Sequence, residues 1–200
     1  MTQPRDLIVI GASLGGLKAL NELSSGLTSD FPAAILIVLH SSPESPRMFA
    51  KILGQHTPLS VDYAEQGGRI LPGHILFAPP GLHMVVLDEG FVGLHAGPKV
   101  RHSRPAADVL FRSAAEVYGP RVIGVVLTGG DGDGTDGLRA IERAGGIGIV
   151  QKPDDAVNPS MPLSAIRGVD PDYCVPLDGM AGLLTRLVTD FAHDTQRTTS

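Results

Sequence analysis

Short runs of apolar, mostly β-branched residues alternate along the chain with segments of helical periodicity. In the strongest recurring pattern a run ends at a glycine or a polar residue, and a helix-like segment follows it. The pattern predicts strands over residues 7–10, 33–39, 122–127 and 146–150, and helices over residues 17–27, 46–53 and 136–144. Continuous apolar strands separated by helices are typical of parallel sheets that are covered on both faces. We therefore expect an α/β fold, with a doubly wound, mostly parallel sheet and helices on both of its faces.

The middle of the chain has a different pattern, in which turn residues separate very short apolar runs. Residues 70–83 are typical of hairpin-like strands and turns, and residues 85–87 and 91–94 flank a favourable hairpin turn at 88–90. We expect a β-hairpin insertion here. A helix should begin near Ser103-Arg104-Pro105, and a last helix should cover residues 183–191. The chain then forms one domain over residues 1–192, with a flexible polar tail over residues 193–200.

The composition narrows the class of partners. The 200 residues carry a net charge of −5, whereas a nucleic-acid-binding surface is usually basic, so we expect no nucleic-acid partner. The single cysteine, Cys174, permits no intrachain disulfide and fits a reducing compartment. The first residues do not have the pattern of a signal peptide, and no apolar stretch reaches the ~20 residues of a membrane helix. These features predict a cytoplasmic protein without membrane insertion.

The first predicted strand leads into a motif that suits a nucleophile. Residues 11–15, Gly-Ala-Ser-Leu-Gly, fit the G-x-S-x-G pattern between a strand and a helix. A sharp turn there exposes the hydroxyl of Ser13, and the helix N-terminus offers N–H donors to an oxyanion. Two other interpretations stay open, in which Ser13 caps the helix or the glycine-rich turn binds a phosphate. The motif lies at the first strand, whereas α/β-hydrolases place their nucleophile well into the chain.

A serine hydroxyl needs a base, and the base needs an acid that fixes its tautomer. His40 follows the most apolar predicted strand, so it should emerge at the same edge of the sheet as Ser13. The alternative for His40 is a purely structural role. The strand over residues 122–127 leads into a glycine-rich loop that contains Asp131 and Asp133. These two carboxylates are equal candidates for the acid.

The same loop has some of the spacing of a calcium site. Asp131, Asp133, Thr135 and Glu142 stand at positions 1, 3, 5 and 12 of an EF-hand-like loop. Position 6, however, is Asp136 where an EF-hand has glycine, and a buried strand precedes the loop where an EF-hand has a helix. We therefore expect no calcium site here.

Several ordered blocks of the chain resemble one family, the catalytic domain of the chemotaxis protein-glutamate methylesterases, or CheB family. The blocks extend over most of the chain, which makes their combination specific. They are Ile8-Val9-Ile10-Gly11-Ala12-Ser13-x-Gly15-Gly16, His40, Pro72-Gly73-His74-Ile75-x-x-Ala78-Pro79, His83-Met84, Arg104-Pro105-x-x-Asp108-Val109-Leu110-Phe111, Leu127-Thr128-Gly129, Asp133-Gly134-x-x-Gly137, Gln151 and Met161-Pro162-x-x-Ala165-Ile166.

The resemblance implies a catalytic triad of Ser13, His40 and Asp133, in that chain order, and so selects Asp133 over Asp131. It implies hydrolysis of γ-glutamyl methyl esters on the cytoplasmic signalling helices of methyl-accepting chemoreceptors. Some members also deamidate glutamine on these helices. It implies no metal or organic cofactor, and it points to the backbone N–H groups of Gly130 and Leu14 as oxyanion donors.

Some positions near the predicted site depart from the family pattern. Leu14 replaces threonine after the nucleophile, Gly130 replaces methionine in a Thr-Gly-Met segment, and Ser103 replaces a histidine before Arg-Pro. Around the base, residues 39–43 read Leu-His-Ser-Ser-Pro where the family has Gln-His-Met-Pro. The three triad positions are unchanged. Two other functions stay open on the same fold, which are a non-catalytic adaptor that binds receptor or another signalling protein, and a serine esterase for another substrate.

The family commonly carries an N-terminal receiver domain that phosphorylation controls. This chain has six residues before its first predicted strand, and it begins at Met1. That start favours a stand-alone member, for which a separate response regulator is a candidate partner.

Overall fold

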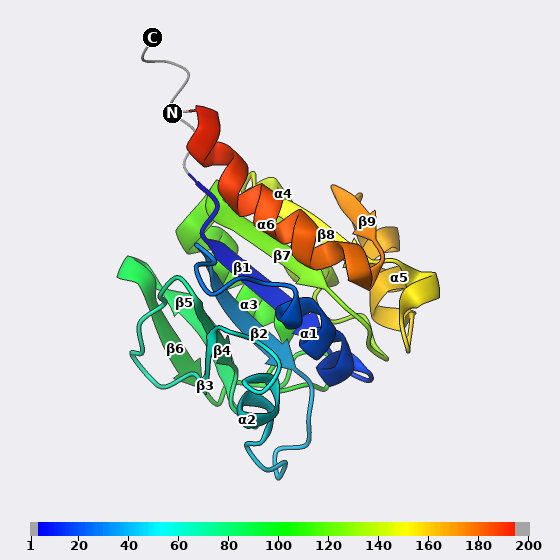
Figure 1. Cartoon of the computed structure of the whole chain (residues 1–200). Coiled ribbons are helices and arrows are strands. Elements are labelled where there is room, and N and C mark those ends of the chain that lie inside the picture. Colours follow the sequence, from blue (N-terminus) through cyan, green and yellow to red (C-terminus); the bar gives the residue numbers. More distant parts are fainter. Residues whose placement is uncertain (1–3, 195–200) are drawn as a thin grey trace.

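Seven strands form one sheet in which every neighbouring pair runs parallel. The structure is a computed structural model, and it describes residues 4–194. The order across the sheet is β3-β4-β2-β1-β7-β8-β9, so β1 lies at its centre (Figure 1). The strands are β1 (Leu7–Ala12), β2 (Ala34–Leu39), β3 (Ser60–Tyr63), β4 (His74–Phe77), β7 (Val122–Val126), β8 (Ile147–Gln151) and β9 (Tyr173–Val175).

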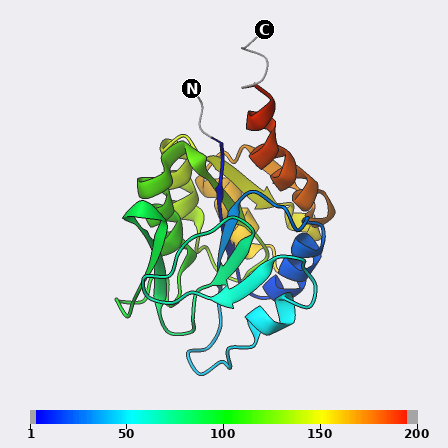
Figure 2. The same cartoon turned by 60° about the vertical axis from the view of Figure 1, so that its left-hand side comes forward.

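Helices cover both faces of this sheet (Figures 1 and 2). The α-helices are α1 (Gly16–Ser25), α2 (Phe49–Leu53), α3 (Ala107–Tyr118), α4 (Thr135–Arg143), α5 (Ser160–Gly168) and α6 (Leu177–Asp194). Short 3-10 helices are η1 (Asp88–Gly90), η2 (Gly119–Arg121) and η3 (Pro153–Asp155). Figure 2 shows α3 and α4 on one side of the sheet, with α1 and α6 on the other. None of the helices within residues 4–194 is long and apolar enough to cross a membrane.

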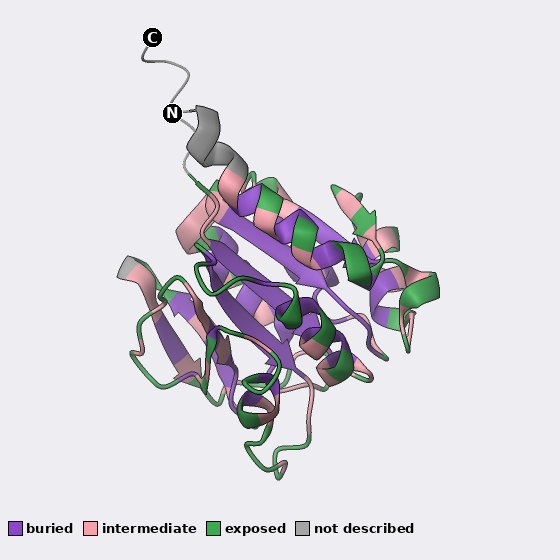
Figure 3. Ribbon diagram, viewed as in Figure 1, coloured by how far each residue is buried: buried purple, intermediate pink, exposed green. Residues whose placement is uncertain are grey.

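The central strand divides its side chains between two apolar cores. All six residues of β1 are buried, which explains its uninterrupted apolar pattern. Ile8 and Ile10 pack into the core under α1 and α6, whereas Leu7 and Val9 pack into the core under α3 and α4. Figure 3 shows the central strands buried, with exposed residues on loops and outer helix faces. The central strands β1, β2 and β7 are therefore closed to solvent along their length, and polar groups can reach solvent only at the ends of these strands.

A separate antiparallel hairpin packs against the α3 side of the molecule. It consists of β5 (His83–Leu87) and β6 (Phe91–His95), joined at residues 88–90. Met84, Val86 and Val92 of the hairpin belong to the core that contains α3. The predicted hairpin insertion and the predicted α/β sheet are both confirmed.

Several predictions about the elements were wrong. Residues 70–83 do not form hairpin-like strands, because β4 enters the parallel sheet beside β2. The pattern also missed β3, β9 and α5, which are short and are stabilised by neighbours far away in sequence. Helix α3 begins at Ala107 rather than near residue 103. Helix α6 extends from Leu177 to Asp194 and so includes the first two residues of the predicted tail, while residues 195–200 lie outside the described residues.

The order of the sheet decides which loops meet. Strand β1 pairs with β2 on one side, where Ala12 lies opposite Leu39, and with β7 on the other, where Gly11 lies opposite Val126. The residues that follow these three strands therefore emerge together at one edge of the sheet. Ser13, His40 and the loop of residues 128–134 lie at that edge.

The close contact between α3 and α4 predicts that Gly137→Ala destabilises the protein. A β-carbon at position 137 would lie 2.5 Å from Cβ of Phe111 and 3.1 Å from Cα of Asp108. Overpacking of this kind costs about 1–3 kcal/mol. Urea unfolding followed by circular dichroism should show this loss. The matched control is Gly182→Ala on α6, where no atom lies within 4 Å of the new methyl group. Alanine there should raise the free energy of unfolding by about 0.5–1 kcal/mol, and an equal response at both sites would contradict the packing argument.

Candidate active site

Ser13 lies in the turn between β1 and α1, and glycines shape this turn. Gly15 has a φ of 81°, and a β-carbon there would lie 2.6 Å from Cβ of Val157. Gly11 allows equally close packing, because its β-carbon would lie 2.7 Å from Cβ of Ala107. The N–H of Ser13 donates to the carbonyl of Thr128 at 2.9 Å, which ties the turn to the loop after β7.

The side chain of Ser13 is not used to cap α1. The N-cap of this helix is Gly15, and the helix has no side-chain cap hydrogen bond. Within residues 4–194, the hydroxyl of Ser13 has no hydrogen-bond partner, and Ser13 is half-buried in the wall of a hollow. The helix-cap interpretation of Ser13 is therefore wrong, and the hydroxyl is available for chemistry.

His40 follows β2 directly and is held at the same edge of the sheet. Its N–H donates to the carbonyl of Ala12 at 3.0 Å, and its side chain is only 11% exposed. Nε2 lies 2.7 Å from Oδ2 of Asp133, while Nδ1 lies 3.4 Å from Oδ2 of Asp131. Burial acts to lower the pKa of His40, but the contacts with Asp131 and Asp133 outweigh it and raise this pKa to about 9.

Asp133 is a fully buried carboxylate that is satisfied by backbone amides. Its oxygens accept hydrogen bonds from the N–H groups of Ala107 at 2.5 Å, Asp108 at 2.9 Å and Gly134 at 3.0 Å. Two of these donors belong to the first turn of α3, where the helix dipole also favours a negative charge. Helix α3 lacks a side-chain cap of its own, so Asp133 takes this role from a distant loop. The carboxylate is thus fixed in place before it contacts His40.

A second buried carboxylate, that of Asp108, belongs to a residue whose backbone N–H donates to Asp133. Asp108, which is itself buried, accepts the N–H of Gly137 at 2.7 Å and contacts Nε of Arg101 at 3.3 Å. Burial raises the pKa of Asp108. Because the backbone N–H of Asp108 donates to Asp133, these hydrogen bonds link the first turns of α3 and α4 to the loop of residues 128–134.

Asp131 lies beside His40 at the rim of the site. Its side chain is 36% exposed, and its Oδ1 accepts the N–H of Asp133 at 3.0 Å. Burial acts to raise the pKa of Asp131, but the contact with His40 and the N–H of Asp133 hold it below its usual range. Both carboxylates that the sequence offered as equal candidates therefore contact the same imidazole, at different ring nitrogens.

The loop after β7 is anchored by residues outside the predicted triad. The N–H of Thr128 donates to Oε1 of Gln151 at 2.9 Å, and the hydroxyl of Thr128 donates to the carbonyl of Leu14 at 2.9 Å. Asn158 accepts the N–H of Gly129 at 3.0 Å through its carbonyl. Gln151 stands in one of the blocks that resemble the family, but the sequence carries no signal for the role of Asn158, because Asn158 bonds this loop through its own backbone N–H and carbonyl.

The two N–H groups predicted to bind the oxyanion, those of Leu14 and Gly130, make no hydrogen bond to the described part of the chain. The N–H groups of Ser13 and Gly129 are bonded to Thr128 and Asn158, whereas those of Leu14 and Gly130 have no acceptor within residues 4–194. Both free groups lie on the segments that carry or contact Ser13. A carbonyl oxygen near Ser13 could therefore be met by backbone donors that are already fixed.

The reactive side chains face a hollow of about 380 Å³ at the edge of the sheet. Its lining includes Ser13 and His40 together with the apolar side chains of Leu14, Leu17 and Phe49. Leu14 is 62% exposed at the rim. A smaller hollow of about 130 Å³ adjoins His40 on its other side. The site combines a free hydroxyl, an imidazole held by a buried carboxylate and free amide donors, which is the equipment for acyl transfer.

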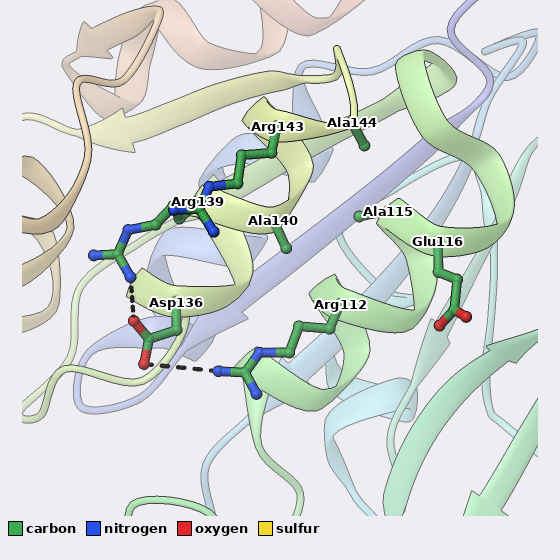
Figure 4. Close-up of a pocket in the computed structure, with 8 residues that line it drawn as sticks. All are labelled: Arg112, Ala115, Glu116, Asp136, Arg139, Ala140, Arg143 and Ala144. Carbon is green, nitrogen blue, oxygen red and sulfur yellow. Dashed lines mark hydrogen bonds and ion pairs between the residues drawn. The ribbon is translucent and has the colours of Figure 1, made fainter.

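Another hollow, of about 650 Å³, lies elsewhere, between α3 and α4 (Figure 4). There Asp136 contacts Arg139 at 2.5 Å and Arg112 at 3.7 Å, and it also contacts Arg101 at 3.0 Å. The carboxylate of Asp136 thus faces guanidinium groups, while Asp131 and Asp133 face His40. Across residues 4–194, no group of three or more His, Cys, Asp or Glu could hold a metal ion.

Comparisons with known proteins agree with this architecture. A family model described as CheB methylesterase matches residues 8–184. A protein-glutamate methylesterase/protein-glutamine glutaminase 2 from Methanosarcina acetivorans is 40% identical over 192 residues, which cover 92% of this chain and 54% of that protein. A putative protein-glutamate methylesterase/protein-glutamine glutaminase from Leptospira interrogans is 37% identical over 182 residues, covering 91% of this chain and 94% of that protein. The chain thus spans about half the length of several curated relatives.

A solved structure shows the same fold. The crystal structure of the Thermotoga maritima CheB methylesterase catalytic domain superimposes with a TM-score of 0.89 at 32% sequence identity. The match covers 94% of this chain and 100% of that domain. The family model accounts for nearly the whole described chain, and the fold is that of the solved catalytic domain. This chain belongs to the CheB methylesterase family.

Proposed function

We propose that this protein is a serine hydrolase that removes methyl groups from γ-glutamyl methyl esters on the cytoplasmic helices of chemoreceptors. The same centre would deamidate glutamine side chains on such helices. The observation that carries the proposal is the convergence of Ser13, His40 and Asp133 at the ends of three adjacent strands. The names of the relatives, protein-glutamate methylesterase/protein-glutamine glutaminase, support the choice of substrate.

The roles of the triad residues follow from which atoms are free. Asp133 holds the Nε2–H of His40, which leaves Nδ1 as the nitrogen that can take a proton. The hydroxyl oxygen of Ser13 attacks the ester carbonyl while its proton passes to Nδ1. The N–H groups of Leu14 and Gly130 would bind the oxyanion. Methanol leaves with the proton from Nδ1, and water attacks the acyl-enzyme by the same route in reverse.

The shape of the site fits an ester on a protein surface. The hollow at Ser13 is open, and the exposed side chain of Leu14 forms its rim. A glutamyl methyl ester reaches out from a helix on a short flexible side chain, so its carbonyl can enter while the helix stays outside. The apolar lining from Leu17 and Phe49 suits a methyl group better than a free carboxylate. This would let the methylated side chain bind and the product leave.

One observation favours a second candidate, a non-catalytic receptor-binding adaptor. No hydrogen bond joins the hydroxyl of Ser13 to His40 within residues 4–194, and Nδ1 of His40 faces Asp131 instead. In enzymes without bound substrate, catalytic hydrogen bonds are often long and tighten when substrate binds. This geometry is therefore compatible with a hydrolase as well as with an adaptor. The two candidates differ in turnover. An adaptor would bind methylated receptor without releasing methanol.

Replacing Ser13 should abolish turnover if the triad acts as a unit. We expect Ser13→Ala to lower kcat for methanol release from methylated receptor by up to ~10⁶-fold. Ser25→Ala is the matched control, since its hydroxyl lies on the exposed end of α1 and bonds only the carbonyl of Glu22. Methanol release that Ser13→Ala leaves undiminished would refute the assignment. Parallel assays with small esters and with glutamine-containing receptor would separate a general esterase from a receptor-directed enzyme.

The raised pKa of His40 should also appear in the stability of the protein. Folding raises this pKa from 6.5 to about 9, so its stabilising contribution is complete below pH 6.5 and is lost as the pH rises through 9. The contribution is on the order of 3 kcal/mol. Urea unfolding of the wild type should show a fall in stability across this window. The His40→Gln protein, with no titrating group at this position, should lose that part of the slope, and an unchanged slope would show that His40 is not held by the carboxylates.

A further inference from the structure

His40 is held between two carboxylates, and only one of them is explained by the proposed mechanism. Asp133 lies 2.7 Å from Nε2 and orients the ring, which is the work of the acid in a serine triad. Asp131 lies 3.4 Å from Nδ1, on the opposite side of the ring. In the proposed mechanism, Nδ1 is the nitrogen that accepts the proton from the hydroxyl of Ser13.

We propose that Asp131 is a positioning residue that holds the Nδ1 side of His40 in the resting enzyme, in competition with the hydroxyl of Ser13. This inference rests on the proposed function, because it assigns a state to the base of the same reaction. While Asp131 occupies Nδ1, the hydroxyl of Ser13 has no acceptor there. The contact between Asp131 and Nδ1 therefore keeps His40 from activating the hydroxyl of Ser13.

The protons account for this resting state. When both ring nitrogens donate, to Asp133 and to Asp131, the imidazole is a cation and cannot accept a proton. Activation requires that His40 lose the Nδ1 proton to solvent, which leaves a lone pair directed at the site. The hydroxyl of Ser13 can then donate to Nδ1 and attack the ester carbon. Because the side chain of Asp131 is 36% exposed, water has access to this proton.

The charges around His40 favour the same assignment. The contacts with the two carboxylates raise the pKa of His40 to about 9, despite its burial. At pH 7 only about 1% of His40 would then be the neutral base. The other basic side chains that line the hollows shared with His40 are Lys18 in the larger hollow and Lys99, His102 and Arg104 in the smaller one. The raised pKa of His40 is explained by its contacts with the two carboxylates.

One substitution separates the charge of Asp131 from its structural contact. Oδ1 of Asp131 accepts the N–H of Asp133 at 3.0 Å, and this bond shapes the loop. Asp131→Asn keeps an oxygen acceptor for that N–H but removes the negative charge beside Nδ1. Asp131→Glu keeps the charge and serves as the conservative rescue. Asp154→Asn is the matched control, because it removes one exposed carboxylate from the loop after β8, and it has no contact with His40.

The first test measures His40 directly and does not require turnover. Histidine ring signals would be followed by NMR from pH 5.5 to 10.5, with His40 assigned by its absence in His40→Gln. We expect a midpoint near 9 in the wild type and in Asp154→Asn. In Asp131→Asn the pKa of His40 should fall by about 1 unit or more, and in Asp131→Glu it should return toward the wild-type value. A midpoint that is the same in Asp131→Asn and the wild type would overturn the proposal.

The second test is the pH dependence of methanol release from methylated receptor. Since His40 must be neutral to act as the base, kcat/KM should rise with pH through its pKa. The rise should move to lower pH in Asp131→Asn, so that this variant is about tenfold faster than the wild type at pH 7. The two profiles should approach each other above pH 10. A merely structural role would lower activity at every pH, and that result would overturn the proposal.

The two tests keep this inference apart from the proposed function. If the wild type releases no methanol at any pH, the methylesterase proposal is wrong, and the NMR midpoint still decides whether Asp131 holds His40. If methanol is released and the NMR midpoint of His40 is the same in Asp131→Asn and the wild type, the methylesterase proposal stands and the role proposed for Asp131 is wrong. Asp131→Ala, which loses both the charge and the acceptor for Asp133, would show how much of any loss comes from the loop.

Discussion

The buried carboxylate of Asp133 is the interaction on which the rest of the site depends. An ionised carboxylate without exposure to water is stable only if its oxygens are fully bonded. Here the first turn of α3, the backbone of Gly134 and the ring of His40 supply those bonds. One group therefore caps a helix, closes the loop after β7 and orients the imidazole. Removing it would disturb fold and site together.

This arrangement is possible because the sheet brings three loops to one edge. Strand β1 lies between β2 and β7, and all three run parallel, so their carboxyl ends coincide. Close packing then fixes the distances. Gly11 lets β1 approach Ala107 at the start of α3, and Gly137 lets α4 approach Phe111. The glycines of the family blocks thus hold the two helices at the separation that the carboxylate of Asp133 requires.

The carboxylate of Asp131 gives the site the resting state that we propose, in addition to the reactive state. Asp131 and Asp133 face opposite ring nitrogens of His40 and raise the pKa of its imidazole to about 9, while the hydroxyl of Ser13 has no hydrogen-bond partner among the described residues. The apolar rim at Leu14 and the unbonded N–H groups of Leu14 and Gly130 lie at the same edge of the sheet. In the mechanism that we propose, the step that remains is the release of one proton from His40, which is a small change compared with the folding of the site.

The sequence by itself determined the fold class, the elbow at Ser13 and the two loops that meet it, because apolar periodicity and turn residues act locally. It could not rank Asp131 against Asp133 from the residues alone, and only the resemblance to the family selected Asp133. It also missed β3, β9 and α5, which owe their form to distant neighbours, and Asn158, which bonds the loop after β7 through its backbone. Only the tertiary structure decided which ring nitrogen each carboxylate faces. That outcome depends on the approach of α3 to the loop after β7, a contact between segments 25 or 26 residues apart, which no local pattern encodes.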